Sequence, residues 1–193
     1  MKKLLLIAVA AFLFLNTSAQ TGLKKGETAP AFSAVDNTGK SLDLKDLLKK
    51  HKAVVLFFYR GQWCPYCNKQ ISHLQDSLQL LTAKGAYVIG VTPETGENIN
   101  KTIDKTHASF SIIQDKNYTI MKAYQVNYVV DDAMLAKLKN YGIDLEKNNG
   151  NTDHVLPVPA TYVIDRSGKI IYAHVDKDYT KRPPVSDLLS ALN

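Results

Sequence analysis

The chain has 193 residues, of which 45% are hydrophobic and 22% are charged, and these are ordinary values for a globular protein. They exclude a disordered chain, a collagen and a multi-pass membrane protein. The formal net charge is +6 and no run of like charge exceeds two residues, so neither a nucleic acid nor an anionic membrane is an expected partner.

The first 19 residues have the pattern of an export leader. Lys2 and Lys3 precede an apolar run from Leu4 to Leu15, and small residues follow before Gln20. Twelve helical residues cover about 18 Å, too short for a bilayer core of about 30 Å. The pattern predicts a signal peptide over residues 1–19, a periplasmic or secreted protein, and no stable membrane anchor after the leader is removed.

Downstream of the leader, strand and helix patterns alternate. Short strands are expected at 32–35 and after a turn at 37–39, followed by a short helix. Residues 53–59 form a continuous apolar run of strand length, which is typical of a central strand covered on both faces. Apolar residues then recur every three or four positions, which predicts a helix from Cys67 to about Leu81.

The alternation continues to the C-terminus and predicts one α/β domain over residues 20–193. Further strands are predicted at 87–92, 110–114, 160–164 and 170–173, and further helices at about 94–107, at 118–124 and from about 185. The short turn at 165–168 makes the last two strands antiparallel, so the sheet is mixed.

Residues 127–154 are expected to be an insertion within this domain. It should contain a helix at 131–139 and a polar loop at 148–151. The apolar residues Met134, Leu135 and Leu138 predict that this helix sits on the core, and a pocket wall or a dimer contact is the alternative.

Both cysteines of the chain lie in Trp63-Cys64-Pro65-Tyr66-Cys67, between a buried strand and a helix. The positive end of the helix favours a thiolate by roughly 1 kcal/mol, which is about one pKa unit. Cys64 is nearer to that end and is therefore the expected nucleophile, with Cys67 one turn on as its partner. The spacing indicates a pair that cycles between dithiol and disulfide.

Other uses of the cysteine pair are a structural disulfide, a metal site and haem attachment. A disulfide that closes a four-residue loop would stabilise the fold by only about 2 kcal/mol. A zinc site needs four ligands, and the five histidines are scattered without ligand spacing. Haem attachment would require a histidine at position 68, which is Asn68. No metal and no bound cofactor are expected.

Three segments of the chain resemble the thioredoxin fold, and within it the peroxiredoxin-like proteins of the alkyl hydroperoxide reductase and thiol-specific antioxidant family. They are 26–32, 57–67 and 158–165. The resemblance covers most of residues 20–193. It implies a thioredoxin-like three-layer fold with a mixed central sheet and with the insertion placed before a cis-proline strand, in which Pro159 faces the cysteine pair.

The resemblance also implies a function. It is that of an antioxidant oxidoreductase that reduces hydroperoxides through Cys64 and Cys67 and is regenerated by a thioredoxin-like dithiol reductant. One alternative is an exported thiol-disulfide oxidoreductase whose substrates are protein disulfides. The other is a non-catalytic binding module that keeps the fold.

Two alignments assign different roles to the cysteines. The peroxiredoxin pattern Pro-x-x-x-Thr-x-x-Cys places Cys67 at the attacking position, with Cys64 at the threonine and Arg60 at the proline. The thioredoxin pattern makes Cys64 the attacking thiol. The family's proline and threonine are absent in either alignment, and its arginine has no counterpart at Pro159.

Three further residues near the pair are candidates for supporting roles. Arg60 would supply the missing positive charge to a thiolate or peroxide, or else is a solvated surface arginine. Trp63 would pack over the strand end, shield the thiol or contact a partner protein. Pro65 would stiffen the first turn of the helix, where its missing N–H is harmless.

Overall fold

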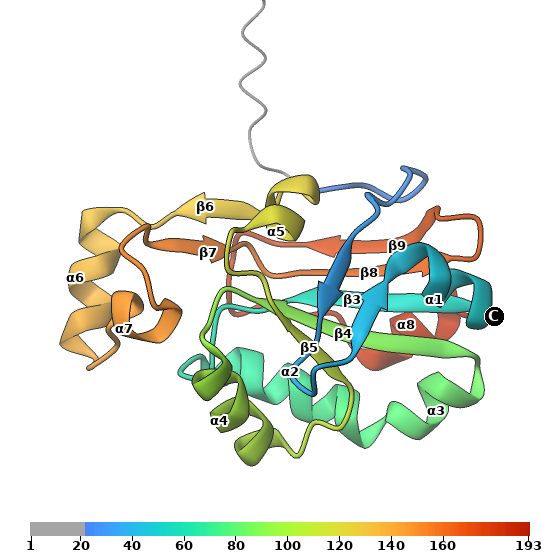
Figure 1. The fold of residues 1–193 in the computed structure, drawn as a ribbon, viewed down its shortest axis with the longest axis horizontal. Coiled ribbons are helices and arrows are strands. Elements are labelled where there is room, and N and C mark those ends of the chain that lie inside the picture. The colour runs from blue at the N-terminus through green and yellow to red at the C-terminus, as the bar shows by residue number, and fades with distance from the viewer. Residues whose placement is uncertain (1–21) are drawn as a thin grey trace, which may run out of the picture.

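A computed structural model describes residues 22–193 of the chain (Figure 1). The predicted signal peptide at residues 1–19 lies outside the described residues. None of the helices in the described part combines the length and the apolar character that a bilayer crossing requires.

The described chain is built around a five-stranded sheet with the strand order β5-β4-β3-β8-β9. β4 runs parallel to β3 and β5 parallel to β4, whereas β8 is antiparallel to both β3 and β9. The strands are β3 (Ala53–Phe58), β4 (Ala86–Thr92), β5 (Ser111–Gln114), β8 (Ala160–Asp165) and β9 (Ile170–Val175). Every strand lies within two residues of its predicted range, and the prediction of a mixed sheet is confirmed.

The central strand β3 is buried along its whole length and feeds two separate cores. Val54, Leu56 and Phe58 belong to one core, and Val55 and Phe57 belong to the other. This alternation follows from the two-residue period of a strand. Because helices cover both cores, the molecule has the expected three layers.

One face of the sheet is covered by the N-terminal elements and α5, and the other face by four helices. The first group is β1 (Ser33–Val35), β2 (Ser41–Asp43), α1 (Leu44–Lys50) and α5 (Thr119–Ala123). The second group is α2 (Pro65–Asp76), α3 (Leu78–Ala83), α4 (Gly96–Thr106) and α8 (Val185–Ala191). Figure 1 shows α2, α3 and α4 together below the sheet.

The single helix predicted from Cys67 to about Leu81 is two helices in the structure. α2 begins earlier, at Pro65, because Cys64 caps it and proline suits the first turn. The backbone of Ser77 leaves helical geometry between α2 and α3. Both helices still direct their apolar residues into the same core, which is why the sequence spacing looked continuous.

The insertion consists of a strand, two helices and a second strand that pairs with the first. Its parts are β6 (Asn127–Val129), α6 (Asp132–Asn140) and α7 (Leu145–Asn149), and β6 pairs antiparallel with β7 (Val155–Pro157). α6 was predicted, whereas the three-residue strands are too short to show an alternating pattern. α7 was missed because its last residues fall in the predicted 148–151 loop.

The helix α6 does not pack on the central sheet as expected. It contributes to a small local core of Val130, Leu138, Leu145 and Leu156, against which Met134 and Leu135 also pack. Figure 1 shows α6 and α7 beyond the end of the main sheet, carried there by β6 and β7. The insertion therefore packs around its own small core at one end of the central sheet.

Candidate active site

Both cysteines lie where β3 passes into α2, and both are reduced and buried. Cys64 is the N-cap of α2, and its Sγ accepts a hydrogen bond from the Cys67 N–H at 3.4 Å. Pro65 occupies the first turn, as predicted. β3 ends at Phe58, and six residues later Cys64 begins α2 as its N-cap. Cys67 follows three residues further on, so both sulfurs lie in the first turn of the helix.

A positive side chain contacts Cys67 from a distant part of the chain. Arg182 Nη2 donates to Cys67 Sγ at 3.2 Å. Burial alone would raise the pKa of Cys67, but the hydrogen bond from Cys64, the charge of Arg182 and the Arg60 backbone together lower it to about 6. Of the two sulfurs, Cys67 is thus the one at which the surroundings favour the thiolate.

Cys64 behaves in the opposite way. Its hydrogen bond to the Cys67 sulfur, together with burial, raises the pKa of the Cys64 thiol well above its ordinary range. Two adjacent buried sulfurs hold one negative charge more readily than two. The full positive charge of Arg182, which contacts Cys67, outweighs the partial positive charge of the helix end, which lies nearer to Cys64. The expectation that the helix end makes Cys64 the ionised thiol is therefore not supported.

Arg182 is held in place by hydrogen bonds on the sides that do not face the sulfur. Its Nε donates to Gln70 Oε1 at 2.7 Å, and its Nη1 donates to the carbonyl oxygens of Tyr179 and Lys181. Gln70 Nε2 in turn donates to Thr161 Oγ1 at 3.0 Å. α2, β8 and the segment before α8 together aim the guanidinium at Cys67.

Arg60 is buried, with 2% of its surface exposed, so the interpretation as a solvated surface arginine is wrong. Its guanidinium lies between two aromatic rings, 4.8 Å from that of Trp63 and 4.4 Å from that of Tyr179. Its positive charge lowers the pKa of Cys64, but less than the hydrogen bond to Cys67 and burial raise it. Trp63 packs at the junction between the core under α2 and the core of the insertion.

A cavity of about 720 Å³ opens beside Cys64, between the cysteine loop and the insertion. Its walls are mostly apolar and aromatic, and three cations also line it. The cations are Arg60, Lys105 and Lys137, and the apolar and aromatic lining includes Trp63, Met134, Leu138, Tyr141, Ile143 and Tyr179. Cys67 does not line this cavity and has no exposed surface. A molecule in the cavity therefore meets Cys64 first.

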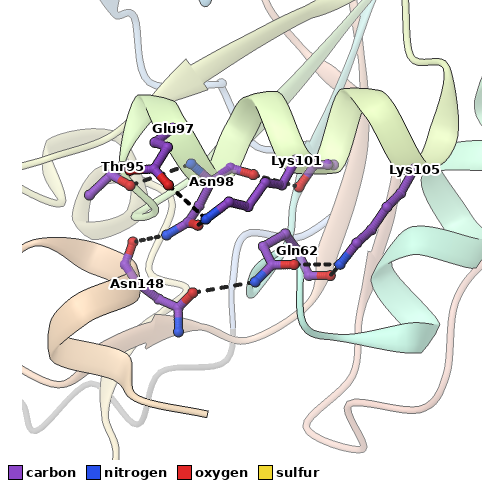
Figure 2. Close-up of polar contacts among 8 residues, drawn as sticks. Gln62, Thr95, Glu97, Asn98, Lys101, Lys105 and Asn148 are labelled. Atoms are coloured by element: carbon purple, nitrogen blue, oxygen red, sulfur yellow. Dashed lines mark hydrogen bonds and ion pairs between the residues drawn. The ribbon is translucent and has the colours of Figure 1, made fainter. Parts of the chain in front are cut away.

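The loop before Cys64 is fastened to α4 and to the insertion through polar contacts (Figure 2). Lys105 Nζ donates to the carbonyl oxygen of Gln62 at 3.2 Å, and the Gln62 side-chain amide donates to Asn148 of α7 at 3.5 Å. Asn98 of α4 donates to the Asn148 carbonyl oxygen at 3.0 Å. These contacts hold α7 and the redox loop in one position relative to α4.

Pro159 lies immediately before β8, next to Ala160, which pairs with Phe58 at the end of β3. Its peptide bond with Val158 is trans, as are all peptide bonds of the described residues, so the expected cis-proline is a wrong prediction. The Val158 N–H donates to Val126 at 2.7 Å. This bond keeps the chain extended as it passes from β7 into β8.

The residues that sequence reasoning missed are Arg182, Gln70, Tyr179 and Glu94. The position of Glu94 was a usable signal, since it lies two residues after β4 and the sites of open α/β folds collect at the carboxyl ends of parallel strands. Arg182 lies 115 positions from Cys67, and no sequence signal connects the two residues. Within residues 22–193, no three His, Cys, Asp or Glu side chains form a group that could hold a metal ion.

Comparison with known proteins places the chain in one family. The model of the AhpC/TSA family matches residues 25–173. Peroxiredoxin Bcp of Escherichia coli is 27% identical over 104 residues, or 54% of this chain and 65% of that protein. A Buchnera aphidicola protein that bears the peroxiredoxin name bcp is 30% identical over 106 residues, or 55% of this chain. The chain spans just under two thirds of the length of each of these relatives.

A solved structure has a similar fold. The crystal structure of peroxidoxin BcpB from Mycobacterium tuberculosis superposes with a TM-score of 0.69, covering 88% of this chain and 96% of that one at 20% identity. That likeness supports the thioredoxin-like fold with a mixed sheet.

Proposed function

The chain belongs to the AhpC/TSA family, and on this basis we propose that it is a thiol-dependent peroxidase whose cycle runs through Cys67 and Cys64. The observation that carries the proposal is the contact between Arg182 and the buried sulfur of Cys67 at 3.2 Å. A thiolate is the nucleophilic form of cysteine, and Arg182 stabilises it at this sulfur.

In the first step, the Cys67 thiolate attacks the terminal oxygen of a hydroperoxide. The O–O bond breaks, a sulfenic acid forms on Cys67, and the remaining alkoxide or hydroxide takes up a proton. Because Cys67 has no exposed surface, the peroxide reaches it only when a covering side chain moves. The Arg182 guanidinium is the positive charge beside the reacting oxygens.

In the second step, Cys64 condenses with the sulfenic acid. An S–S bond forms between the two residues, the S–O bond of Cys67 breaks, and the thiol proton and the hydroxyl leave as water. The two cysteines already lie in hydrogen-bond contact across one helical turn. No other cysteine is needed, and the chain has none.

In the third step, an external dithiol protein reduces the disulfide by attacking Cys64. Cys64 lines the 720 Å³ cavity, whereas Cys67 does not. Attack at Cys64 releases Cys67 as a thiolate, and a thiol of low pKa is the better leaving group. We propose a thioredoxin-like protein as this donor, since thiol-disulfide exchange is the chemistry that the geometry accommodates.

We further propose that the protein acts outside the cytoplasm. The support is the sequence pattern of residues 1–19, with its two lysines and its apolar run. Fractionation of cells that express the full chain, with the N-terminus of the product read by mass spectrometry, tests this. Recovery of an intact N-terminus in the cytoplasm would contradict it.

Stopped-flow mixing of the reduced protein with hydrogen peroxide or an alkyl hydroperoxide tests the peroxidase function. We expect second-order formation of the Cys64–Cys67 disulfide, much faster than the oxidation of free cysteine. A rate equal to that of free cysteine would contradict the proposal.

A second candidate function is exchange with protein disulfides, which the opening of the cavity at Cys64 favours. Rapid exchange with a protein disulfide, without a fast reaction with peroxide, would support this candidate. An unshifted thiol pKa and no turnover in either assay would instead indicate a binding module.

A further inference from the structure

A buried carboxylic acid lies directly against the loop that carries the cysteine pair. Glu94 follows β4 and has no exposed surface. Its Oε2 accepts a hydrogen bond from the Gln62 N–H at 2.8 Å. Its Oε1 is equally buried and has no hydrogen-bond partner among residues 22–193. One oxygen of this carboxyl group is therefore free to hold a proton.

The packing at Gly61 shows how close the carboxyl group lies to the redox loop. A Cβ atom at Gly61 would lie 2.6 Å from Glu94 Oε1 and 2.5 Å from Trp63 Nε1. The carbonyl oxygen of Gly61 accepts the Cys64 N–H at 3.0 Å. The backbone from Gly61 to Cys64 thus contacts the Glu94 carboxyl group at its first residues, and its last residue is the N-cap of α2.

The ionisable groups around this acid come from several elements. Burial, with a further contribution from the negative charge of Cys67, raises the pKa of Glu94 to about 8, against the opposing effects of the Gln62 N–H and of two lysines. The groups that face Glu94 or the two sulfurs are Tyr59, Arg60, Cys64, Cys67, Lys101, Lys105, Tyr128 and Arg182. Among them, only Cys67 changes from a charged to an uncharged state in the proposed cycle.

We propose that Glu94 stores the second proton of the dithiol state. When the disulfide is reduced, Cys64 takes up one proton, Glu94 takes up the other, and Cys67 remains a thiolate beside Arg182. The balanced step is one disulfide, one Glu94 carboxylate, two electrons and two protons giving one thiol, one thiolate and one carboxylic acid. The external dithiol donor supplies both electrons and both protons. This inference rests on the proposed redox cycle of Cys64 and Cys67.

The coupling follows from simple electrostatics. A thiolate and a carboxylate in one buried region repel each other, so the negative charge of Cys67 adds to the effect of burial, which is the larger cause, in keeping Glu94 protonated. Oxidation converts the thiolate into a neutral disulfide sulfur, and Glu94 then loses its proton more readily. The acid keeps the net charge of the buried site nearly constant through the cycle.

The test is the pH dependence of the reduction potential, measured by equilibration with dithiothreitol between pH 6 and pH 8. This range lies between the pKa of about 6 for Cys67 and that of about 8 for Glu94 in the reduced protein. Uptake of one proton per two electrons changes the equilibrium constant tenfold per pH unit, or about 30 mV. Two protons change it a hundredfold, or about 59 mV.

We expect the wild-type slope to exceed the one-proton value and to approach the two-proton value. Glu94→Gln keeps the shape of the side chain and an acceptor for the Gln62 N–H but holds no titratable proton, so its slope should fall to about 30 mV per pH unit. Glu97→Gln is the matched control, because Glu97 lies only three residues further on, in the first turn of α4, where it is exposed and pairs with Lys101. Its slope should equal that of the wild type.

Equal slopes for the wild type and Glu94→Gln would overturn the proposal. If Glu94→Gln fails to fold, infrared difference spectra of the wild type at pH 7 decide the matter. A protonated-carboxyl band that weakens on oxidation supports the proposal, and the lack of any change in that band overturns it. Neither measurement uses peroxide, so a failure here is distinct from a failure of the peroxidase function.

Discussion

Replacing Arg182 with methionine should raise the pKa of Cys67 and slow its reaction at low pH without unfolding the protein. Methionine keeps most of the apolar stem and removes the guanidinium, which donates to Cys67 Sγ at 3.2 Å. A hydrogen bond to a charged group contributes about 1.5–3 kcal/mol. The lower figure applies, because Arg182 is only partly buried and water screens its charge.

A loss of about 1.5 kcal/mol corresponds to about one pKa unit. The pKa of Cys67 should therefore rise from about 6 to about 7. At pH 6 the thiolate fraction then falls from about one half to about one tenth, and the rate of reaction with peroxide falls about fivefold. Well above pH 8 both proteins are fully ionised at this sulfur, and the loss due to thiolate fraction disappears.

The assay is a pH series of stopped-flow oxidations, together with thiolate absorbance titrations in a Cys64→Ser background. Arg166→Met is the matched control, because Arg166 is exposed and donates to the His51 carbonyl oxygen far from the sulfurs. It should leave the pKa of Cys67 unchanged. An unchanged pKa in Arg182→Met, or an equal shift in the control, would refute the assignment of Arg182.

Three further outcomes are expected. Cys67→Ser should lose the reaction with peroxide, whereas Cys64→Ser should form a sulfenic acid on Cys67 without a disulfide; mass spectrometry after peroxide treatment distinguishes them, and the reverse result would exchange the two roles. The pKa of Glu94 is raised on folding, so its contribution to stability is full below about pH 4.5 and is lost as the pH rises through about 8. The free energy of unfolding of the reduced wild type should therefore fall relative to Glu94→Gln by at most about 1.4 kcal/mol per pH unit in that range, and urea titrations at pH 5 and pH 7.5 showing no difference would be inconsistent with a buried acid. Gly61→Ala should destabilise the fold by about 1–3 kcal/mol, since its Cβ would lie 2.5 Å from Trp63 Nε1. A Cβ atom at Gly96 would have no atom from the rest of the fold within 4 Å, so Gly96→Ala should be neutral or stabilising. Thermal melts of both variants test this difference.

The parts of the fold that the sequence predicted are those specified by local pattern. The apolar run of β3 indicated a central strand, because a strand that is buried on both faces reads as a continuous run of apolar residues. The cysteine pair was placed at a helix N-terminus for the same kind of reason, since Pro65 suits a first turn. β6 and β7 were not predicted, because three residues are too few to show an alternating pattern.

The roles of the two sulfurs required information that lies far away in the chain. The helix end acts on Cys64 and is visible in the local sequence. Arg182 acts on Cys67 from 115 positions away, and nothing around it in the sequence connects it with a cysteine. The helix end alone favours a thiolate at Cys64, whereas the contact with Arg182 favours a thiolate at Cys67.

The Arg182 contact determines both halves of the proposed cycle. In the reduced protein it makes Cys67 the thiolate that meets peroxide, and in the oxidised protein it makes Cys67 the better leaving group when a donor attacks Cys64. A lower pKa favours departure but weakens intrinsic nucleophilicity. The charge of Arg182 lowers the pKa of Cys67, which favours both the thiolate form that attacks and the departure of Cys67 from the disulfide. A second cation at Cys67 would speed its release and slow its attack, so one half-buried arginine serves this site better than two.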